Sequence, residues 1–187
     1  MGYPGEVAIA PGQVFPAREL TAVSGERVAV PDPKQVVHLQ LRRFAGCPIC
    51  HLHLRSFERR ANELSAAGIR EVIVFHSPAE ELAPHATQLP FALIPDPERR
   101  LYRELGVESA PRALLDPRAW PGIARAVLLG TFEMLRGRAR PPALAPQGGR
   151  LGLPADFLIA SDGTVLACKY GEHADDQWSV DELLERI

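Results

Sequence analysis

The feature that most constrains the fold is a pair of cysteines, Cys47 and Cys50, placed where a strand-like segment gives way to a helical one. Segment 36–41 is apolar and partly alternating, which is typical of a strand, and apolar residues recur at helical spacing from Leu52 to Leu64. Cysteines three residues apart at a helix start lie one turn apart on one face, close enough for a disulfide. The positive end of the helix favours a thiolate at the first of them. We therefore predict a redox-active dithiol in which Cys47 is the nucleophile and Cys50 resolves the intermediate.

The rest of the chain predicts strands that alternate with helices. The helix after the motif is expected to end near Ala67, before Gly68. Further helices are expected to begin near Ser77 and Asp96. Besides 36–41, the expected elements are strands at 71–75 and 91–94, a β-hairpin over 157–170 and a final helix at 181–187. This order predicts an α/β fold with a central mixed sheet flanked by helices.

A chain of 187 residues is long enough for one domain with a substantial core, so we expect a single domain over 1–187. Residues 1–34 contain short extended pieces and a turn at 24–26, which predict an N-terminal β extension. Residues 107–150 are expected to form an insert before the C-terminal hairpin. Within that insert, 123–135 is expected to be helical and 136–140 to be an exposed basic loop.

Composition excludes several classes of protein. The formal net charge is -2 and there is no long basic stripe, so nucleic acid is not an expected partner. No apolar run approaches the roughly 20 residues of a membrane helix, so no membrane partner is expected. Three cysteines are no disulfide framework, and the chain begins without the pattern of a secretory signal. We therefore expect a cytoplasmic location.

The run from His38 to Leu54 resembles the peroxiredoxin-like branch of the thioredoxin superfamily, the AhpC/TSA redoxins. The segments 74–77, 101–107 and 152–159 share this resemblance, as does the tail from Tyr170. It implies a thioredoxin-like fold and a thiol-dependent oxidoreductase of antioxidant type, acting on peroxides or disulfides without a bound cofactor or metal. A thioredoxin-like protein or a low-molecular-weight thiol would act as the reductant, and a homodimer is a candidate assembly.

Two positions depart from the family pattern. Typical peroxiredoxins carry a Thr three residues before the reactive cysteine, where this chain has Phe44. They also carry an Arg before the strand that ends in the Asp-Gly turn, where this chain has 153–155. Pro154 there resembles the cis-proline of thioredoxins. The resemblance therefore implies a peroxiredoxin-like protein with thioredoxin-style dithiol chemistry.

Neighbouring residues are predicted to support the dithiol. Pro48 suits the first helical turn, where its missing N–H has no partner to lose. His51 lies four residues after Cys47 and is expected either to tune its pKa or relay a proton, or to be a solvated helix residue. Arg42 and Arg43 are expected either to favour the thiolate or to be solvated.

Three other side chains are expected to be less involved. His53 is predicted to be structural or exposed. Asp156 is predicted to be a surface carboxylate rather than a buried proton acceptor. Cys168 is predicted to be a buried and inert thiol rather than a second resolving cysteine.

Other readings of the motif remain open. The protein could be a redox sensor or interaction protein of thioredoxin fold without efficient turnover. Cys47, Cys50 and His51 also match the attachment pattern of c-type haem, which ranks lower because no export signal is seen. Zinc bound by these residues and His53 ranks lower as well, because one helical turn cannot direct four adjacent side chains at one centre.

Overall fold

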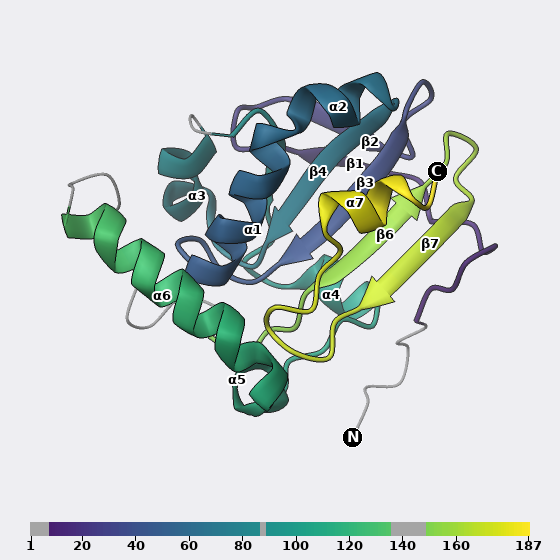
Figure 1. The fold of residues 1–187 in the computed structure, drawn as a ribbon. Helices are drawn as coiled ribbons and strands as arrows, with labels where there is room; N and C mark the ends of the chain where they lie inside the picture. Colours follow the sequence, from purple (N-terminus) through teal and green to yellow (C-terminus); the bar gives the residue numbers. More distant parts are fainter. Residues whose placement is uncertain (1–7, 87–88, 136–148) are drawn as a thin grey trace.

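The computed structural model describes residues 8–86, 89–135 and 149–187. At its centre lies a five-stranded sheet in the order β5-β4-β3-β6-β7 (Figure 1). Its strands are β3 (Val36–Arg42), β4 (Ile69–Phe75), β5 (Ala92–Pro95), β6 (Ala155–Ile159) and β7 (Val165–Tyr170). Strands β3, β4 and β5 run parallel, whereas β6 is antiparallel to β3 and β7 to β6. The mixed sheet and its C-terminal hairpin were both expected from the sequence.

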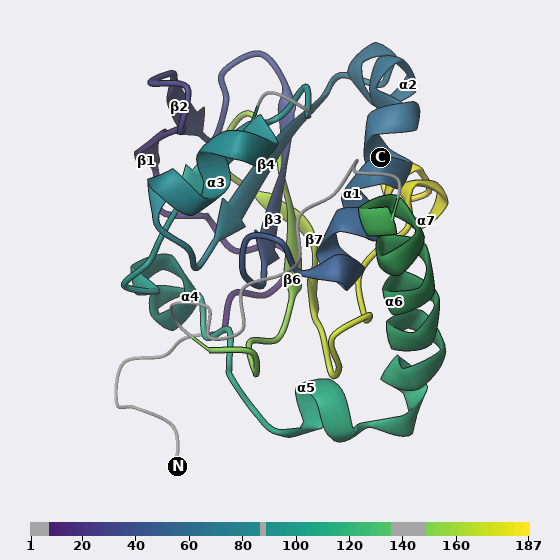
Figure 2. The same ribbon diagram turned by 90° about the vertical axis from the view of Figure 1, so that its left-hand side faces the viewer.

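Helices and a separate hairpin cover the two faces of this sheet (Figure 2). One face carries α1 (Pro48–Arg59), α2 (Ala61–Ala66) and α7 (Val180–Leu184). The other carries α4 (Arg100–Glu104) and the hairpin of β1 (Arg18–Thr21) and β2 (Arg27–Val30). The remaining helices are α3 (Ala79–Ala86), α5 (Arg112–Leu115), the short 3₁₀ helix η1 (Pro117–Ala119) and α6 (Trp120–Leu135). None of the helices in the described part of the chain is both long and apolar enough to cross a membrane.

The central strand β3 has an apolar face and a polar face, and both faces are buried. Val37, Leu39 and Leu41 point into the core shared with the β1–β2 hairpin and α4. The alternate residues His38, Gln40 and Arg42 point to the other face and are fully buried as well. A strand buried on both faces normally reads as a continuous apolar run, so these polar residues need partners inside the protein.

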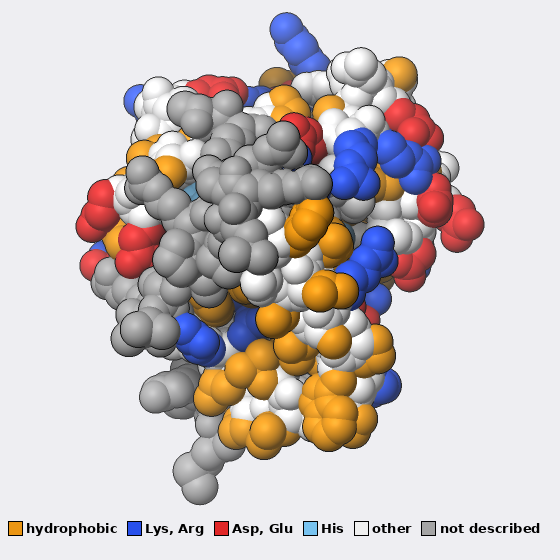
Figure 3. Space-filling view, turned by 60° about the vertical axis from the view of Figure 1, so that its left-hand side comes forward, with side chains coloured by type: hydrophobic (Ala, Val, Ile, Leu, Met, Phe, Trp, Pro, Cys, Tyr) orange, Lys and Arg blue, Asp and Glu red, His pale blue; other side chains and the backbone are white. Residues whose placement is uncertain are grey.

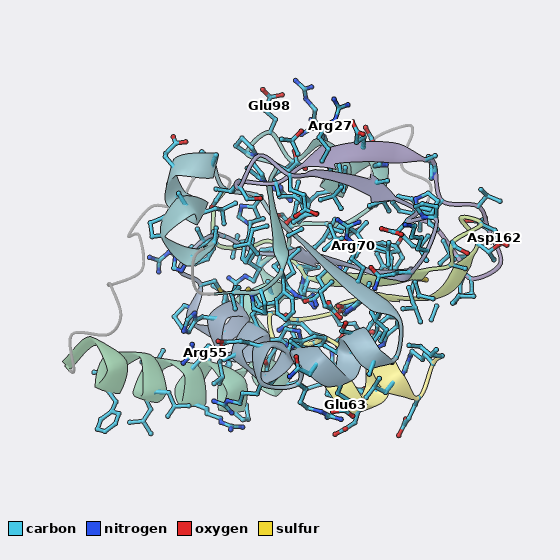
Figure 4. All side chains as sticks on the ribbon, turned by 90° about the horizontal axis from the view of Figure 1, so that it is seen from above. Arg27, Arg55, Glu63, Arg70, Glu98 and Asp162 are labelled. Atoms are coloured by element: carbon cyan, nitrogen blue, oxygen red, sulfur yellow. The ribbon has the colours of Figure 1, made fainter. Side chains whose placement is uncertain are left out.

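The helix predicted to run to Ala67 is in fact two helices. The backbone leaves helical geometry at Arg60 (φ -112°, ψ 18°), which separates α1 from α2. The Arg60 guanidinium binds Glu63 at 2.7 Å and Asp181 of α7 at 2.5 Å. Figure 4 shows Glu63 beside the C-terminal helix, so this break brings α2 and α7 together.

The turn and the helix cap predicted near the ends of the chain are both present, although the final helix ends at Leu184 and not at residue 187. The turn at 24–26 joins β1 and β2, with Gly25 at a φ of +86°. Residues Ser179 and Glu182 form a reciprocal capping box at the start of α7. The segment 107–150 contains α5, η1 and α6, and the predicted basic loop 136–140 lies outside the described residues.

Candidate redox site

The two cysteines lie at the carboxyl end of β3, where the chain enters α1. Gly46 adopts a φ of +76°, a conformation that L side chains rarely take, and this lets the loop turn into the helix. Cys47 is the N-cap residue, with extended backbone angles, and Pro48 occupies the first turn as predicted. The carbonyl of Cys47 accepts the first helical hydrogen bond, from His51 N at 2.9 Å.

Both cysteines are buried, and no disulfide joins them in this structure. Cys47 and Cys50 are free thiols, each about 1% exposed. They belong to an apolar cluster that also contains Phe44, Ile49 and Ala126. Burial in such surroundings disfavours a charged sulfur unless a nearby group compensates for it.

Arg43 supplies that compensation. Its side chain is only 3% exposed, and its Nη1 lies 3.6 Å from Cys47 Sγ. Its Nη2 donates to the carbonyl oxygen of Arg150, and its Nε is buried without a hydrogen-bond partner within the described residues. Among the described residues the buried carboxylate of Asp156 forms its ion pair with Arg42 and not with Arg43. A buried guanidinium needs an anion, and the anion available beside it is the Cys47 thiolate.

The pKa values of the two thiols are shifted in opposite directions, down for Cys47 and up for Cys50. The pKa of Cys47 falls to about 6, first because Cys50 donates a hydrogen bond to it, and then because of the charge of Arg43 and two backbone N–H groups of α1; burial opposes these effects. The pKa of Cys50 rises, because Cys47 and burial both disfavour its thiolate. At neutral pH the site therefore holds a thiolate at Cys47 and a thiol at Cys50.

The ring of Phe44 lies between the side chains of Arg43 and His76. Its ring is buried, with its centroid 5.5 Å from the Arg43 guanidinium and 6.0 Å from that of Arg150. On another side it faces the ring of His76 at 6.3 Å. An aromatic ring thus occupies the position where typical peroxiredoxins carry a hydroxyl group.

His76 and Ser77 join this site, although the sequence analysis did not select them as site residues. Both follow β4 directly, and the carboxyl ends of adjacent parallel strands meet at one edge of a sheet. His76 N donates to the carbonyl of Arg43 at 3.2 Å, and Ser77 Oγ accepts from Ala45 N at 3.0 Å. These two bonds hold the loop before Cys47, and the parallel pairing of the two strands was the signal that could have identified them.

The two histidines of the motif point in different directions. The side chain of His51 is exposed, which leaves its predicted role untested. The side chain of His53 is partly buried, with Nε2 3.1 Å from Arg42 Nη2 and its ring 4.7 Å from that of Phe57. Burial and the Arg42 charge hold the pKa of His53 well below its usual range. Within the described residues no group of three or more His, Cys, Asp or Glu side chains is arranged so that it could hold a metal ion.

Pro154 does not have the predicted cis geometry. Among the described residues the cis peptide bond is at Val30–Pro31. The chain reaches Pro154 in an extended form, because Gly152 bridges Ser109 and β6 begins at the next residue. Its carbonyl accepts from Gly171 N at 2.9 Å, and it lines a cavity of about 240 Å³ whose lining includes neither cysteine.

Behind the site lies a buried charge network centred on His38. Its ring nitrogens lie 2.8 Å from a Glu71 oxygen and 3.1 Å from an Asp156 oxygen. Arg42 binds the same carboxylate at 2.5 Å, and Gln40 donates to Glu71. Two positive and two negative groups thus balance when His38 is protonated.

The charges of this network fix its protonation. Burial alone would lower the pKa of His38, but Glu71 and Asp156 raise it to about 9. Burial alone would raise the pKa of Asp156, but Arg42 and His38 hold it far below its usual range. The prediction that Asp156 is a surface carboxylate was wrong, since its side chain is fully buried. Its register opposite Gln40 in β3 explains why, because that face of the sheet is covered by α1 and α7.

Cys168 lies on the opposite face of the sheet. It pairs in register with Phe157, packs on the core of the β1–β2 side, and donates from Sγ to the carbonyl of Ile9 at 3.3 Å. Burial raises the pKa of this thiol. The thiol is partly exposed rather than fully buried as predicted, and the sheet separates it from the Cys47–Cys50 pair. That it is unreactive stays a prediction.

Comparisons with known proteins fit this geometry. The family model described as AhpC/TSA antioxidant enzyme matches residues 56–173, more than half of the chain, starting after the two cysteines. No curated protein sequence matches the chain. The peroxidoxin BcpB from Mycobacterium tuberculosis superposes with a TM-score of 0.65 at 16% identity, covering 95% of this chain and 96% of that one.

Two further solved structures show the same fold. A putative thiol:disulfide interchange protein DsbE from Chlorobium tepidum gives a TM-score of 0.60 at 18% identity, over 96% of this chain and 99% of that one. A cysteine-to-serine mutant of peroxiredoxin 6 from Arenicola marina gives 0.66 at 15% identity, over 95% of this chain and 71% of that one. The fold is therefore thioredoxin-like, as the sequence resemblance implied.

Proposed function

Because the chain belongs to the AhpC/TSA antioxidant enzyme family, we propose that it is a thiol-dependent oxidoreductase whose Cys47 thiolate reduces small hydroperoxides and whose Cys50 resolves the product. One observation carries this proposal: a buried Arg43 beside a cysteine whose pKa is lowered to about 6. The thiolate is the reactive form of cysteine, and this environment makes it the main form at neutral pH.

In the first step Cys47 Sγ attacks one oxygen of the hydroperoxide. The S–O bond forms as the O–O bond breaks, and the leaving alkoxide takes up a proton from water to become an alcohol, or water in the case of hydrogen peroxide. Cys47 becomes a sulfenic acid. The Nε–H of Arg43, which has no partner among the described residues, is a donor available to the oxygens that carry the developing negative charge.

In the second step Cys50 attacks the sulfenic sulfur. The S–S bond forms, the S–O bond breaks, and the hydroxyl leaves with the proton of the Cys50 thiol as water. Cys50 is one turn from Cys47 and already interacts with it, so little movement is needed. Two electrons from an external dithiol, or from two low-molecular-weight thiols, return the pair to its reduced state.

The burial of Cys47 favours a small oxidant. At 1% exposure the sulfur cannot meet the disulfide of a folded protein without movement of the surrounding loop, whereas a hydroperoxide is only a few atoms long. Phe44 stands where typical peroxiredoxins have a hydroxyl group that binds the peroxide. In the proposed mechanism Arg43 therefore supplies the hydrogen bonds to the peroxide oxygens.

A second candidate function is thiol-disulfide exchange. The observation that favours it is that Cys50 lies in the first turn of α1, directly after the N-cap residue Cys47. Two thiols one turn apart suit a mixed-disulfide intermediate as well as a sulfenic acid. A redox sensor without turnover would use the same two cysteines but would consume no reductant after one oxidation.

Steady-state turnover separates these candidates. The wild type and its Cys47→Ser, Cys50→Ser and Cys168→Ser variants are supplied with a dithiol reductant and, separately, with hydrogen peroxide or a small disulfide. We expect reductant consumption with peroxide, its loss in Cys47→Ser, and a trappable sulfenic acid in Cys50→Ser. Cys168→Ser is the matched control and is expected to retain activity.

Each other result selects a different function. Faster turnover with the disulfide than with peroxide would favour the exchange reaction. Oxidation of Cys47 without sustained consumption of reductant would favour the sensor. Full peroxidase activity in Cys47→Ser would exclude the proposed mechanism.

A further inference from the structure

The outward face of α6 is an apolar surface of unusual extent. Figure 3 shows hydrophobic side chains gathered over this helix in the lower half of the view. In Figure 4 the side chains of α6 project away from the rest of the molecule. The exposed fractions are high for Trp120 (57%), Val127 (54%), Leu128 (71%), Leu129 (40%) and Phe132 (47%), and for Leu115 (70%) on neighbouring α5. These six residues are called the α6 patch below.

The α6 patch lacks the charges that a water-facing helix normally carries. The sequence of α6 contains two charged residues, Arg125 and Glu133. Arg125 is exposed and, by helical spacing, lies between Phe132 and Leu129 on the same side of the helix. It is close enough to Asp175 of its own chain to lower the pKa of that carboxyl, although burial outweighs this effect. A surface helix usually has polar residues on its outer side, so this face indicates contact with another apolar surface.

The sizes of the side chains on this face are complementary to those of a second, antiparallel copy of the same helix. Trp120, Ala124, Leu128 and Phe132 are all exposed and form one row at four-residue spacing. Rows of this spacing are the ridges by which helices most often pack. Around a two-fold axis level with position 126, Trp120 lies beside Phe132 of a second copy, and Ala124 lies beside Leu128. Aromatic residues then pair at both ends, and a large residue meets a small one twice in the middle.

We propose that the α6 patch is a homodimer interface in which two copies of α6 pack antiparallel around this axis. An isologous interface needs a surface complementary to itself, and an uncharged row with this reversed size pattern meets that need. Aromatic side chains bury roughly 150–250 Å² each, so covering the patch removes on the order of 500 Å² per protomer, or about 1,000 Å² in total. A specific interface is expected to bury at least about 1,000 Å² in total, so the estimated area lies at the lower end of that range and suits a weak dimer.

A second copy fits this surface better than a lipid bilayer does. Helices that lie on membranes usually carry Lys and Arg on their polar side. The inner side of α6 instead packs on the protein, with Ala126 buried in the cluster that contains Cys47 and Cys50. The outward side offers a single arginine to anionic headgroups.

The interface would lie one helix away from the redox site. Residues Ala126 and Ile123 of α6 touch the cluster around the two cysteines, while the outward row faces the second copy. The proposal does not depend on the redox chemistry, since each active site is built from one chain.

Sedimentation velocity over a range of protein concentrations tests the proposal. We expect wild-type protein to dimerise and Leu128→Arg to weaken dimerisation by roughly tenfold or more, because it places like charges near the two-fold axis. Val14→Arg is the matched control: Val14 is 72% exposed, lies outside the patch, and gains the same charge. It is expected to leave dimerisation unchanged. Circular dichroism and the midpoint of thermal unfolding check that each variant is folded.

A reciprocal swap tests the register. Ala124→Leu alone brings two large side chains together, and Leu128→Ala alone leaves a gap, so each is expected to weaken the dimer. The double variant restores a large residue opposite a small one and is expected to recover most of the affinity. A double variant that dimerises as weakly as either single variant would refute the antiparallel register.

Other outcomes overturn the proposal as a whole. These are a wild type that stays monomeric at every concentration, a dimer that Leu128→Arg leaves intact, and Val14→Arg weakening the dimer as much as Leu128→Arg. Monomeric protein that binds neutral phosphatidylcholine vesicles through Leu128 would assign the patch to a lipid surface instead.

Discussion

Replacing Arg43 tests whether a buried guanidinium makes Cys47 reactive. An opposite charge within about 4–6 Å shifts a pKa by roughly 1–3 units. Arg43 Nη1 lies 3.6 Å from the sulfur, and the pKa of Cys47 is about 6. Arg43→Met is therefore expected to raise the pKa of Cys47 to about 7–9. For a value of about 8, the thiolate fraction at pH 7 falls from roughly 90% to roughly 9%, a loss of about tenfold.

The assay is the rate of iodoacetamide alkylation of Cys47 as a function of pH, located by peptide mass spectrometry. Arg43→Lys keeps a positive charge and is expected to shift the midpoint less than Arg43→Met. The matched control is Arg55→Met, which removes an exposed arginine of α1 that pairs with Glu58. If Arg43→Met is folded and its midpoint coincides with that of the wild type, Arg43 does not stabilise the thiolate.

Three further predictions concern stability, measured by denaturant unfolding. The pKa of His38 is raised to about 9 in the folded protein, so its protonation stabilises the fold fully below pH 6.5, and roughly 3 kcal/mol of the free energy of unfolding is lost as pH rises through 9. In a His38→Gln variant the free energy of unfolding should depend less on pH over this range. An equal pH dependence in the variant and the wild type would contradict the assignment. Asp156→Asn leaves Arg42 without its buried carboxylate and should cost about 3–5 kcal/mol, whereas a loss below about 1 kcal/mol would mean that the network is not charged. Ser179→Ala removes the capping box of α7 and should cost about 1 kcal/mol, with no change in the alkylation midpoint of Cys47.

Much of the fold could be predicted because its signals are local. The apolar run of β3, the turn at 24–26 and the capping box at Ser179 each depend on residues close together in sequence. The position of Cys47 at the strand-to-helix junction belongs to the same class. Such features follow from backbone and helix-end chemistry, which the sequence displays directly.

The site details that could not be predicted depend on distant partners. Whether Arg43 is solvated or buried depends on Phe44, Arg150 and the loop after β4, which lie up to about a hundred residues apart. Asp156 reads as a surface residue from its neighbours, but its register against β3 places it beside Arg42.

The cis geometry expected at Pro154 was an inference from resemblance rather than from local chemistry. The structure shows that the chain there continues an extended segment held by Glu108 and Ser109. A single proline carries no information about such a partner. The break at Arg60 belongs to the same category, because it brings that side chain to α7, more than a hundred residues later.

The central sheet divides the interior of the protein into a polar side and an apolar side. The face of the sheet under α1 holds the cysteines at one end and the His38 network behind them, while the opposite face is an apolar core. Arg42 belongs to the network and the next residue, Arg43, to the thiolate. Two consecutive arginines thus contact a buried carboxylate and the sulfur that we propose to be reactive.

The most direct test of the central claim is the product of one oxidation event. Reduced wild-type protein is treated with one equivalent of hydrogen peroxide, digested without reduction, and its cysteine peptides are identified by mass spectrometry. We expect a disulfide between Cys47 and Cys50, with Cys168 still a free thiol. In the Cys50→Ser variant we expect a single added oxygen on Cys47. A disulfide that includes Cys168, or oxidation that begins at Cys50, would contradict the account.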